Sequence, residues 1–210
     1  MNFLAHCALA QDAALAWSCS EQQQTALLAG AVVGDFVKGR LDPGWPHELR
    51  AGVQLHRRID ALCGESDPLR QLNNHFSPSL RRYAPIFVDL LLDHALSHNW
   101  QHWYDETRTE FGPRCYQALD QYRLYLPPSG DRFATYMQRE NLLAHYDQWM
   151  HIERAAGSVL RRLDREHLWP EVQQELPRHQ VRAAAALDDV VPAMREHWQV
   201  WNAFEATAAQ

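Results

Sequence analysis

Apolar residues recur at helical spacing along most of this chain. The pattern predicts helices over residues 2–18, 25–34, 47–63, 66–76, 85–104, 112–126, 131–147, 150–165 and 178–205, the last with an interruption at Pro192. The one obvious break is the Pro-Pro-Ser-Gly stretch at 127–130. The helices on either side of it each need a partner to bury an apolar face. We therefore expect one all-α domain over residues 1–210.

Composition supports a globular helical protein. Hydrophobic residues make up 46% and charged residues 22% of the 210 residues, and the nine glycines are few for a turn-rich β architecture. The net charge of −6 disfavours wholesale nucleic-acid binding. No apolar stretch is long enough to span a bilayer, and the N-terminus lacks the basic start of a signal peptide. We expect a soluble cytoplasmic protein with no membrane or nucleic-acid partner.

The segment at 86–96 carries the first candidate chemistry. Its residues are apolar around the whole helical circle except for Asp89, Asp93 and His94, so the helix should be buried. Asp89 and Asp93 are four residues apart and share a face, where two like charges repel and resist desolvation. A metal cation, buried arginines or protonation of one carboxyl would compensate. A purely structural alternative is a salt bridge to Arg57 or Arg58.

Three further groups are candidates. His56 and Asp60 lie one helical turn apart on, or at the edge of, the core-facing side of helix 47–63, and together they suit either one ion or a mutual hydrogen bond. Asp35 lies near a helix C-terminus, where the dipole disfavours an anion, so it needs Lys38 or a metal as a counter-ion. His6 stands among apolar residues and by itself indicates a hydrogen-bonded core histidine.

A His and Asp set without a cysteine-rich motif favours Mn²⁺, Mg²⁺ or Fe²⁺ over structural zinc. Such an ion lowers the pKa of bound water and offsets charge on a phosphoryl group, which is the chemistry of phosphoester hydrolysis. Competing schemes are weak, because the chain has no GxSxG, P-loop or GxGxxG motif.

These residues also carry a family resemblance. The blocks MNFLAH at 1–6, GDFVKG at 34–39, AGVQLHRRID at 51–60, RRYAPIFVDLLLDH at 81–94 and LSHNW at 96–100 resemble the acyl carrier protein phosphodiesterases, and residues 141–162 do so more loosely. The resemblance implies an HD-like helical hydrolase that favours Mn²⁺. The implied reaction removes 4′-phosphopantetheine from the serine of holo-acyl carrier protein, by attack of metal-activated water on the phosphodiester.

The resemblance also implies roles for single residues. We expect metal ligation by His6, Asp35, His56 and Asp93. We expect Asp60, Asp89 and His94 to orient ligands or move protons, although the adjacent pair Asp93-His94 reverses the usual order of an HD motif. Charge neutralisation at the phosphodiester falls to Lys38, Arg57 and Arg58.

The partner implied by the resemblance fits the charge distribution. Residues 36–82 hold eight basic and five acidic residues, and acyl carrier proteins are strongly acidic. The candidate docking residues are Arg50, Arg70, Arg81 and Arg82. Two alternatives stay open: an HD-like phosphohydrolase acting on a nucleotide or other small phosphoester, and a non-catalytic helical module whose buried Asp and His residues form a satisfied polar network.

Overall fold

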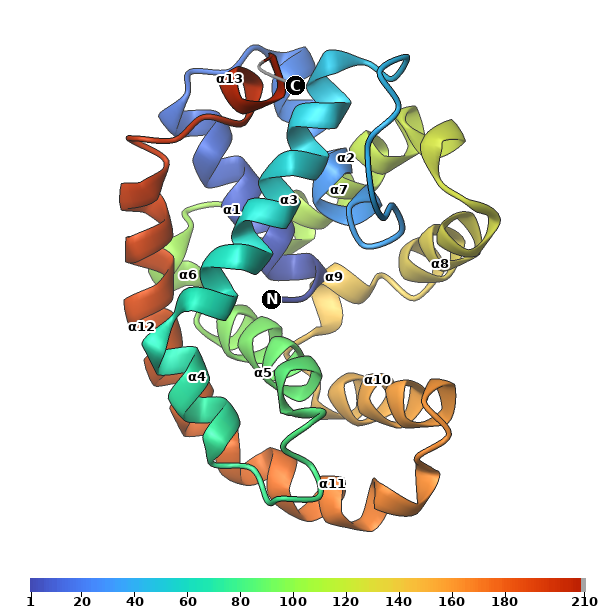
Figure 1. Ribbon diagram of the computed structural model, residues 1–210, viewed down its shortest axis with the longest axis vertical. Helices are drawn as coiled ribbons and strands as arrows, with labels where there is room; N and C mark the ends of the chain where they lie inside the picture. The colour runs from blue at the N-terminus through green and yellow to red at the C-terminus, as the bar shows by residue number, and fades with distance from the viewer. Residues whose placement is uncertain (209–210) are drawn as a thin grey trace.

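The computed structural model describes residues 1–208, and these residues form helices joined by short loops, with no strand among them (Figure 1). The longer helices are α1 (Phe3–Ala16), α2 (Glu21–Val33), α3 (His47–Glu65), α4 (Asp67–Asn74), α5 (Ala84–His98), α7 (Arg108–Gln121), α8 (Pro128–Arg139), α10 (Trp149–Arg162) and α12 (Gln180–His197). The shorter ones are α6 (Trp100–Trp103), α9 (Leu142–His145), α11 (Trp169–Glu175), α13 (Ala203–Ala208) and the 3₁₀ turns η1 (Arg123–Tyr125), η2 (Glu166–Leu168) and η3 (Leu176–His179). The predicted all-α class is confirmed.

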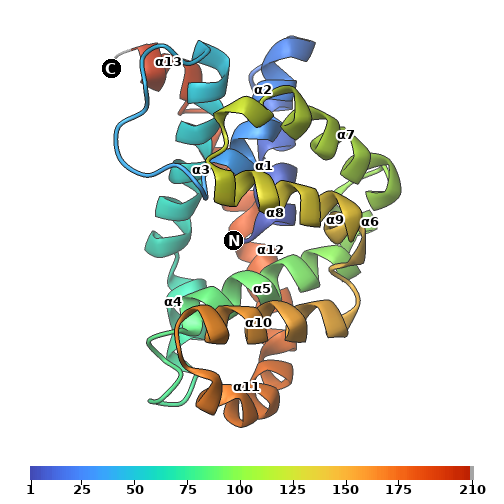
Figure 2. The same cartoon turned by 90° about the vertical axis from the view of Figure 1, so that its right-hand side faces the viewer.

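Helix α1 is the central element. It packs against α2, α3, α5 and α12, and the N-terminus lies near the middle of the molecule in both views (Figures 1 and 2). Nine of its residues are buried, and many of them are alanines, which allow neighbouring helices to approach closely. The buried apolar side chains form one cluster that runs from α1 to Ala203 in α13.

Helices α2 and α3 cross where each presents a glycine. A Cβ atom on Gly30 would lie 2.3 Å from the backbone of Gly52, and one on Gly52 would lie 2.5 Å from the carbonyl oxygen of Ala26. No side chain fits at such distances, so this pair of glycines fixes how closely the two helices approach. The crossing places the C-terminal end of α2 against the middle of α3, where His56 and Asp60 lie.

Local signals explain several boundaries. Ser20 and Thr107 each form a capping box, at the first turns of α2 and α7. Pro128 begins α8 because proline suits the first helical turn, so the predicted break at 127–130 is short. Pro192 does not interrupt α12, contrary to our expectation. Its neighbours Val191 and Met194 are buried, and their packing holds the helix together despite the lost backbone hydrogen bond.

Two other expectations need correction. The predicted helix 85–104 is divided at Asn99 into α5 and α6. The short helix α11 was not predicted, because its seven residues are too few to show a clear apolar period. None of the helices described in residues 1–208 is long and apolar enough to cross a membrane.

Candidate metal centre and adjoining pocket

Three predicted site residues meet in space at the N-terminal end of α1. His6 Nε2 lies 3.1 Å from Asp60 Oδ1, and His56 Nε2 lies 3.3 Å from Asp60 Oδ2. The two imidazole rings stack at 4.1 Å with an interplanar angle of 20°. Helices α1 and α3 thus bring together groups that are 54 residues apart in the sequence. Among the described residues, this is the one group of three or more His, Cys, Asp or Glu side chains that converges closely enough to hold a metal ion.

The other ring nitrogens fix how the two histidines point. His6 Nδ1 lies 2.9 Å from the carbonyl oxygen of Asn2, and His56 Nδ1 lies 2.9 Å from that of Ala31. A carbonyl oxygen only accepts, so both Nδ1 atoms carry a proton. In the neutral ring, Nε2 then presents a lone pair to Asp60. This backbone-oriented imidazole is the arrangement that metal-binding histidines usually adopt.

The electrostatics of the cluster favour a cation between these groups. Two neutral rings would set lone pairs against carboxylate oxygens, whereas two protonated rings would place like charges in stacked contact. Burial, followed by the nearby His56, lowers the pKa of His6 and favours its neutral form. Burial alone would raise the pKa of Asp60, but hydrogen bonds from His56 and His6, formed when Nε2 of the ring is protonated, outweigh it and lower that pKa well below its usual range.

The distances suit a cation as well. The candidate ligand atoms all lie within 4.8 Å of one another. In an octahedral shell with bonds of about 2.1 Å, adjacent ligand atoms are separated by about 3 Å. The side chain of Asp60 is 52% exposed while both histidines are buried, so the cluster opens to solvent on the Asp60 side.

Asp93 and Asp89 do share a face, but that face meets the start of α1. Asp93 is fully buried and accepts hydrogen bonds from the backbone N–H groups of Leu4 at 2.8 Å and Ala5 at 3.1 Å. It therefore caps α1 from another helix, since Asn2 at the N-cap makes no side-chain cap. Burial raises the pKa of Asp93 to about 7, although the two backbone hydrogen bonds lower it. Asp89 lies 2.7 Å from the amino group of Met1.

The structure does not bring the remaining acid and histidine candidates into the cluster. Asp93 uses both carboxylate oxygens on α1, and His94 Nδ1 donates to the carbonyl oxygen of Tyr146 at 2.7 Å. Asp35 is exposed, just beyond the C-terminal end of α2, as predicted. It directly follows Gly34, where an added Cβ would lie 2.3 Å from Cγ of His56, so Asp35 is one residue away from that close contact.

The predicted basic residues lie outside this centre. Lys38 is exposed in the loop after α2. Arg57 donates to the carbonyl oxygen of Val37 at 3.2 Å, and Arg58 Nε lies 3.0 Å from His197 Nε2 in α12. The proposed salt bridges from Arg57 or Arg58 to the buried aspartates do not form. Of the four docking candidates, Arg70, Arg81 and Arg82 are exposed and Arg50 is half-buried.

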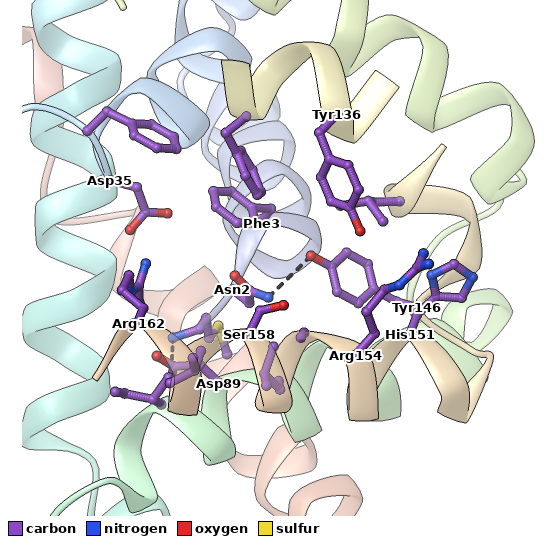
Figure 3. A pocket seen from close by; sticks show the side chains of 18 residues that line it. Asn2, Phe3, Asp35, Asp89, Tyr136, Tyr146, His151, Arg154, Ser158 and Arg162 are labelled. Atoms are coloured by element: carbon purple, nitrogen blue, oxygen red, sulfur yellow. Dashed lines mark hydrogen bonds and ion pairs between the residues drawn. The ribbon is translucent and has the colours of Figure 1, made fainter. Parts of the chain in front are cut away.

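A pocket of about 590 Å³ lies between the start of α1, the end of α2, α5, α8 and α10, and its lining does not include His6, His56 or Asp60 themselves. Its lining includes Asn2, whose carbonyl oxygen holds His6, and Asp35. Figure 3 shows Asp35, Asp89 and Arg162 at one end, beside α3, and Tyr136, His151 and Arg154 at the other. The α10 residues were missed by sequence reasoning, although the four-residue spacing of Arg154, Ser158 and Arg162 was a visible signal.

With the cluster and pocket in place, comparison with known proteins assigns the chain to a class. The family model described as "Acyl carrier protein phosphodiesterase" matches residues 1–194, and the chain belongs to that family. A relative of that name from Enterobacter sp. (strain 638) is 31% identical over 182 residues, which are 85% of this chain and 88% of the relative. One from Escherichia coli O6:H1 is 33% identical over 169 residues, covering 79% and 80% of the two chains. No solved structure matches significantly, so the HD-like label stays a prediction.

Proposed function

We propose that this protein hydrolyses the phosphodiester that joins 4′-phosphopantetheine to a serine of holo-acyl carrier protein, releasing the apo form. The observation that carries the proposal is membership of the acyl carrier protein phosphodiesterase family over residues 1–194. The two relatives described above bear that activity in their names. The cluster beside the pocket supplies the groups that such a reaction requires.

We propose that His6, His56 and Asp60 hold a divalent cation, with Mn²⁺ the expected ion and Mg²⁺ or Fe²⁺ alternatives. Asp60 thereby becomes a ligand instead of an orienting group, because its carboxylate faces both Nε2 atoms. A cation there supplies an activated water and offsets negative charge on the phosphoryl group. We propose Asp35, which directly follows Gly34 and lines the pocket, as the further carboxylate that completes the shell or accepts a proton.

The protein groups around the cluster position it. The carbonyl oxygens of Asn2 and Ala31 orient the two imidazoles, and Asp93 holds the first turn of α1, on which His6 stands. Asp93 is thus a positioning residue. The concave surface of the pocket would hold the substrate. The side chain of Asp60 is exposed, so the cluster is open to solvent on that side.

The direct test incubates purified protein with holo-acyl carrier protein and follows the carrier by intact mass spectrometry. We expect the carrier to lose the mass of phosphopantetheine with Mn²⁺ present and to stay intact with EDTA. His56→Gln and Asp60→Asn should lose both conversion and Mn²⁺ binding, the latter measured by calorimetry, while circular dichroism stays helical. Conversion that survives EDTA, or that both variants retain, would refute the metal assignment. An unchanged carrier under all conditions would refute the reaction.

A further inference from the structure

One face of α10 lines the pocket with polar side chains. Arg154, Ser158 and Arg162 are spaced by four residues, so they lie along the same side of the helix, and all three border the pocket (Figure 3). Arg154 lies 3.7 Å from Glu140. The side chain of Arg162 has no ion pair or hydrogen bond within residues 1–208. A cation without an acidic partner on a concave surface is poised for an anionic ligand.

The charges at the Arg162 end define what kind of anion fits. Two carboxylates, Asp35 and Asp89, border this end as well. The amino group of Met1, 2.7 Å away, offsets the charge of Asp89. Asp35 directly follows Gly34, which packs against the ring of His56 at the end of α2. A cation at the cluster would therefore offset the negative charge of Asp35. A phosphate held between Arg162 and the cluster would then face positive charge on both sides, and the planar guanidinium matches its oxygens.

The rest of the pocket suits an uncharged chain. The ring centroids of Phe3 and Phe133 lie 4.8 Å apart with the rings tilted by 32°, and that of Phe36 lies 5.6 Å from Phe133. Tyr146 Oη accepts a hydrogen bond of 3.2 Å from Asn2, and Arg154 at the far end is paired with Glu140. The volume of about 590 Å³ lies within the range of small-molecule sites and is larger than a phosphate alone requires.

We propose that this pocket binds the phosphopantetheine arm itself, with Arg162 on the phosphate and the aromatic walls around Phe133 on the uncharged remainder. The inference rests on the proposed function and deepens it, because it assigns recognition of the arm to α10 and α8. Specificity for this phosphodiester then comes from the enclosed arm as well as from the surface of the carrier protein.

The test is calorimetric titration of the whole protein, saturated with Mn²⁺, using free 4′-phosphopantetheine and pantetheine, which lacks the phosphate. Wild type should bind phosphopantetheine more tightly than pantetheine. Arg162→Gln should weaken phosphopantetheine binding by about 10- to 100-fold, the range of a charge-assisted hydrogen bond, and leave pantetheine unchanged. Phe133→Ala should weaken both ligands alike. Arg132→Gln is the matched control, since this exposed arginine is on α8 but does not line the pocket.

Two results would overturn the inference: no binding of phosphopantetheine to wild type, or equal binding by Arg162→Gln and wild type. Arg162 is exposed and unpaired among the described residues, so its replacement should leave the fold intact, which circular dichroism checks. The carrier-mass assay separates the two proposals. Conversion of the carrier with Arg162-independent binding removes only the pocket assignment, and Arg162-dependent binding without conversion removes only the reaction.

Discussion

Replacing Gly34 by alanine should disable the proposed metal centre without replacing any of its ligands. A Cβ atom at this position would lie 2.3 Å from Cγ and 2.5 Å from Cδ2 of the His56 ring. Gly34 has φ −54° and ψ −34°, a right-handed conformation that alanine adopts freely. The glycine is therefore required by space alone, because the imidazole of His56 occupies the volume that a methyl group would fill.

The size of the effect follows from the overlap. Carbon atoms in contact are separated by about 3.5–4.0 Å, so the His56 ring has to retreat by more than about 1 Å. Metal–ligand distances vary by only about 0.2 Å, so His56 Nε2 would move out of the coordination shell of the cation. We expect Mn²⁺ affinity to fall at least about 10- to 100-fold, the loss seen when only an outer partner of a ligand is removed. Overpacking should lower the free energy of unfolding by about 1–3 kcal/mol.

The assay is titration of Mn²⁺ by calorimetry, with thermal unfolding measured with and without the ion. Gly64→Ala is the matched control. It lies in α3 with His56, and its Cβ would meet no atom within 4 Å. That change should leave Mn²⁺ affinity unchanged and raise the free energy of unfolding by about 0.5–1 kcal/mol.

Wild-type Mn²⁺ affinity in Gly34→Ala would show that His56 is not a ligand and would refute the reasoning. If the variant is too unstable to titrate, His56→Gln removes the imidazole without adding bulk near Gly34. It should show the same loss of Mn²⁺ affinity.

Four further predictions concern other parts of the structure. Asp93→Ala leaves two backbone N–H groups of α1 without an acceptor, so denaturant unfolding should show a loss of about 1–3 kcal/mol per group, less the relief from a buried carboxyl. Burial raises the pKa of Asp93 from 3.8 to about 7, so the fold holds its proton more tightly than the unfolded chain does. This contribution to the free energy of unfolding is present below about pH 4 and is lost as the pH rises through 7, by up to about 1.4 kcal/mol per pH unit. The free energy of unfolding of Asp93→Asn should lack that dependence on pH between pH 5 and 7. Replacing exposed Arg81 and Arg82 by alanine should lower kcat/KM for holo-acyl carrier protein but spare kcat, with a loss that shrinks as salt rises. Replacing Arg57 and Arg58 should instead lower kcat even at low salt, because Arg57 holds the backbone of Val37, two residues beyond Asp35. Salt-insensitive kcat losses from both pairs would argue against a separate docking surface.

The sequence by itself determined the helical class and most helix positions. The apolar repeat of 3.6 residues that marks a helix depends only on residues close together in the sequence. It also singled out His6, His56 and the same-face pair of aspartates as polar groups on core-facing positions, and Asp60 at the edge of that side. The pairing of His56 with Asp60 followed from their spacing of one turn within α3. Those inferences need no knowledge of which helices meet.

Only the tertiary structure decided which of these groups lie close together in space. The close crossing at Gly30 and Gly52 sets α2 against α3, and it is this contact that lets His56 fit beside Gly34 and reach Ala31. Asp93 shows most clearly what the sequence alone could not predict. Its burial predicted a compensating partner, and a metal was the favoured one. The structure supplies the N–H groups of α1 instead, because the unpaired end of a helix meets the same electrostatic need as a cation.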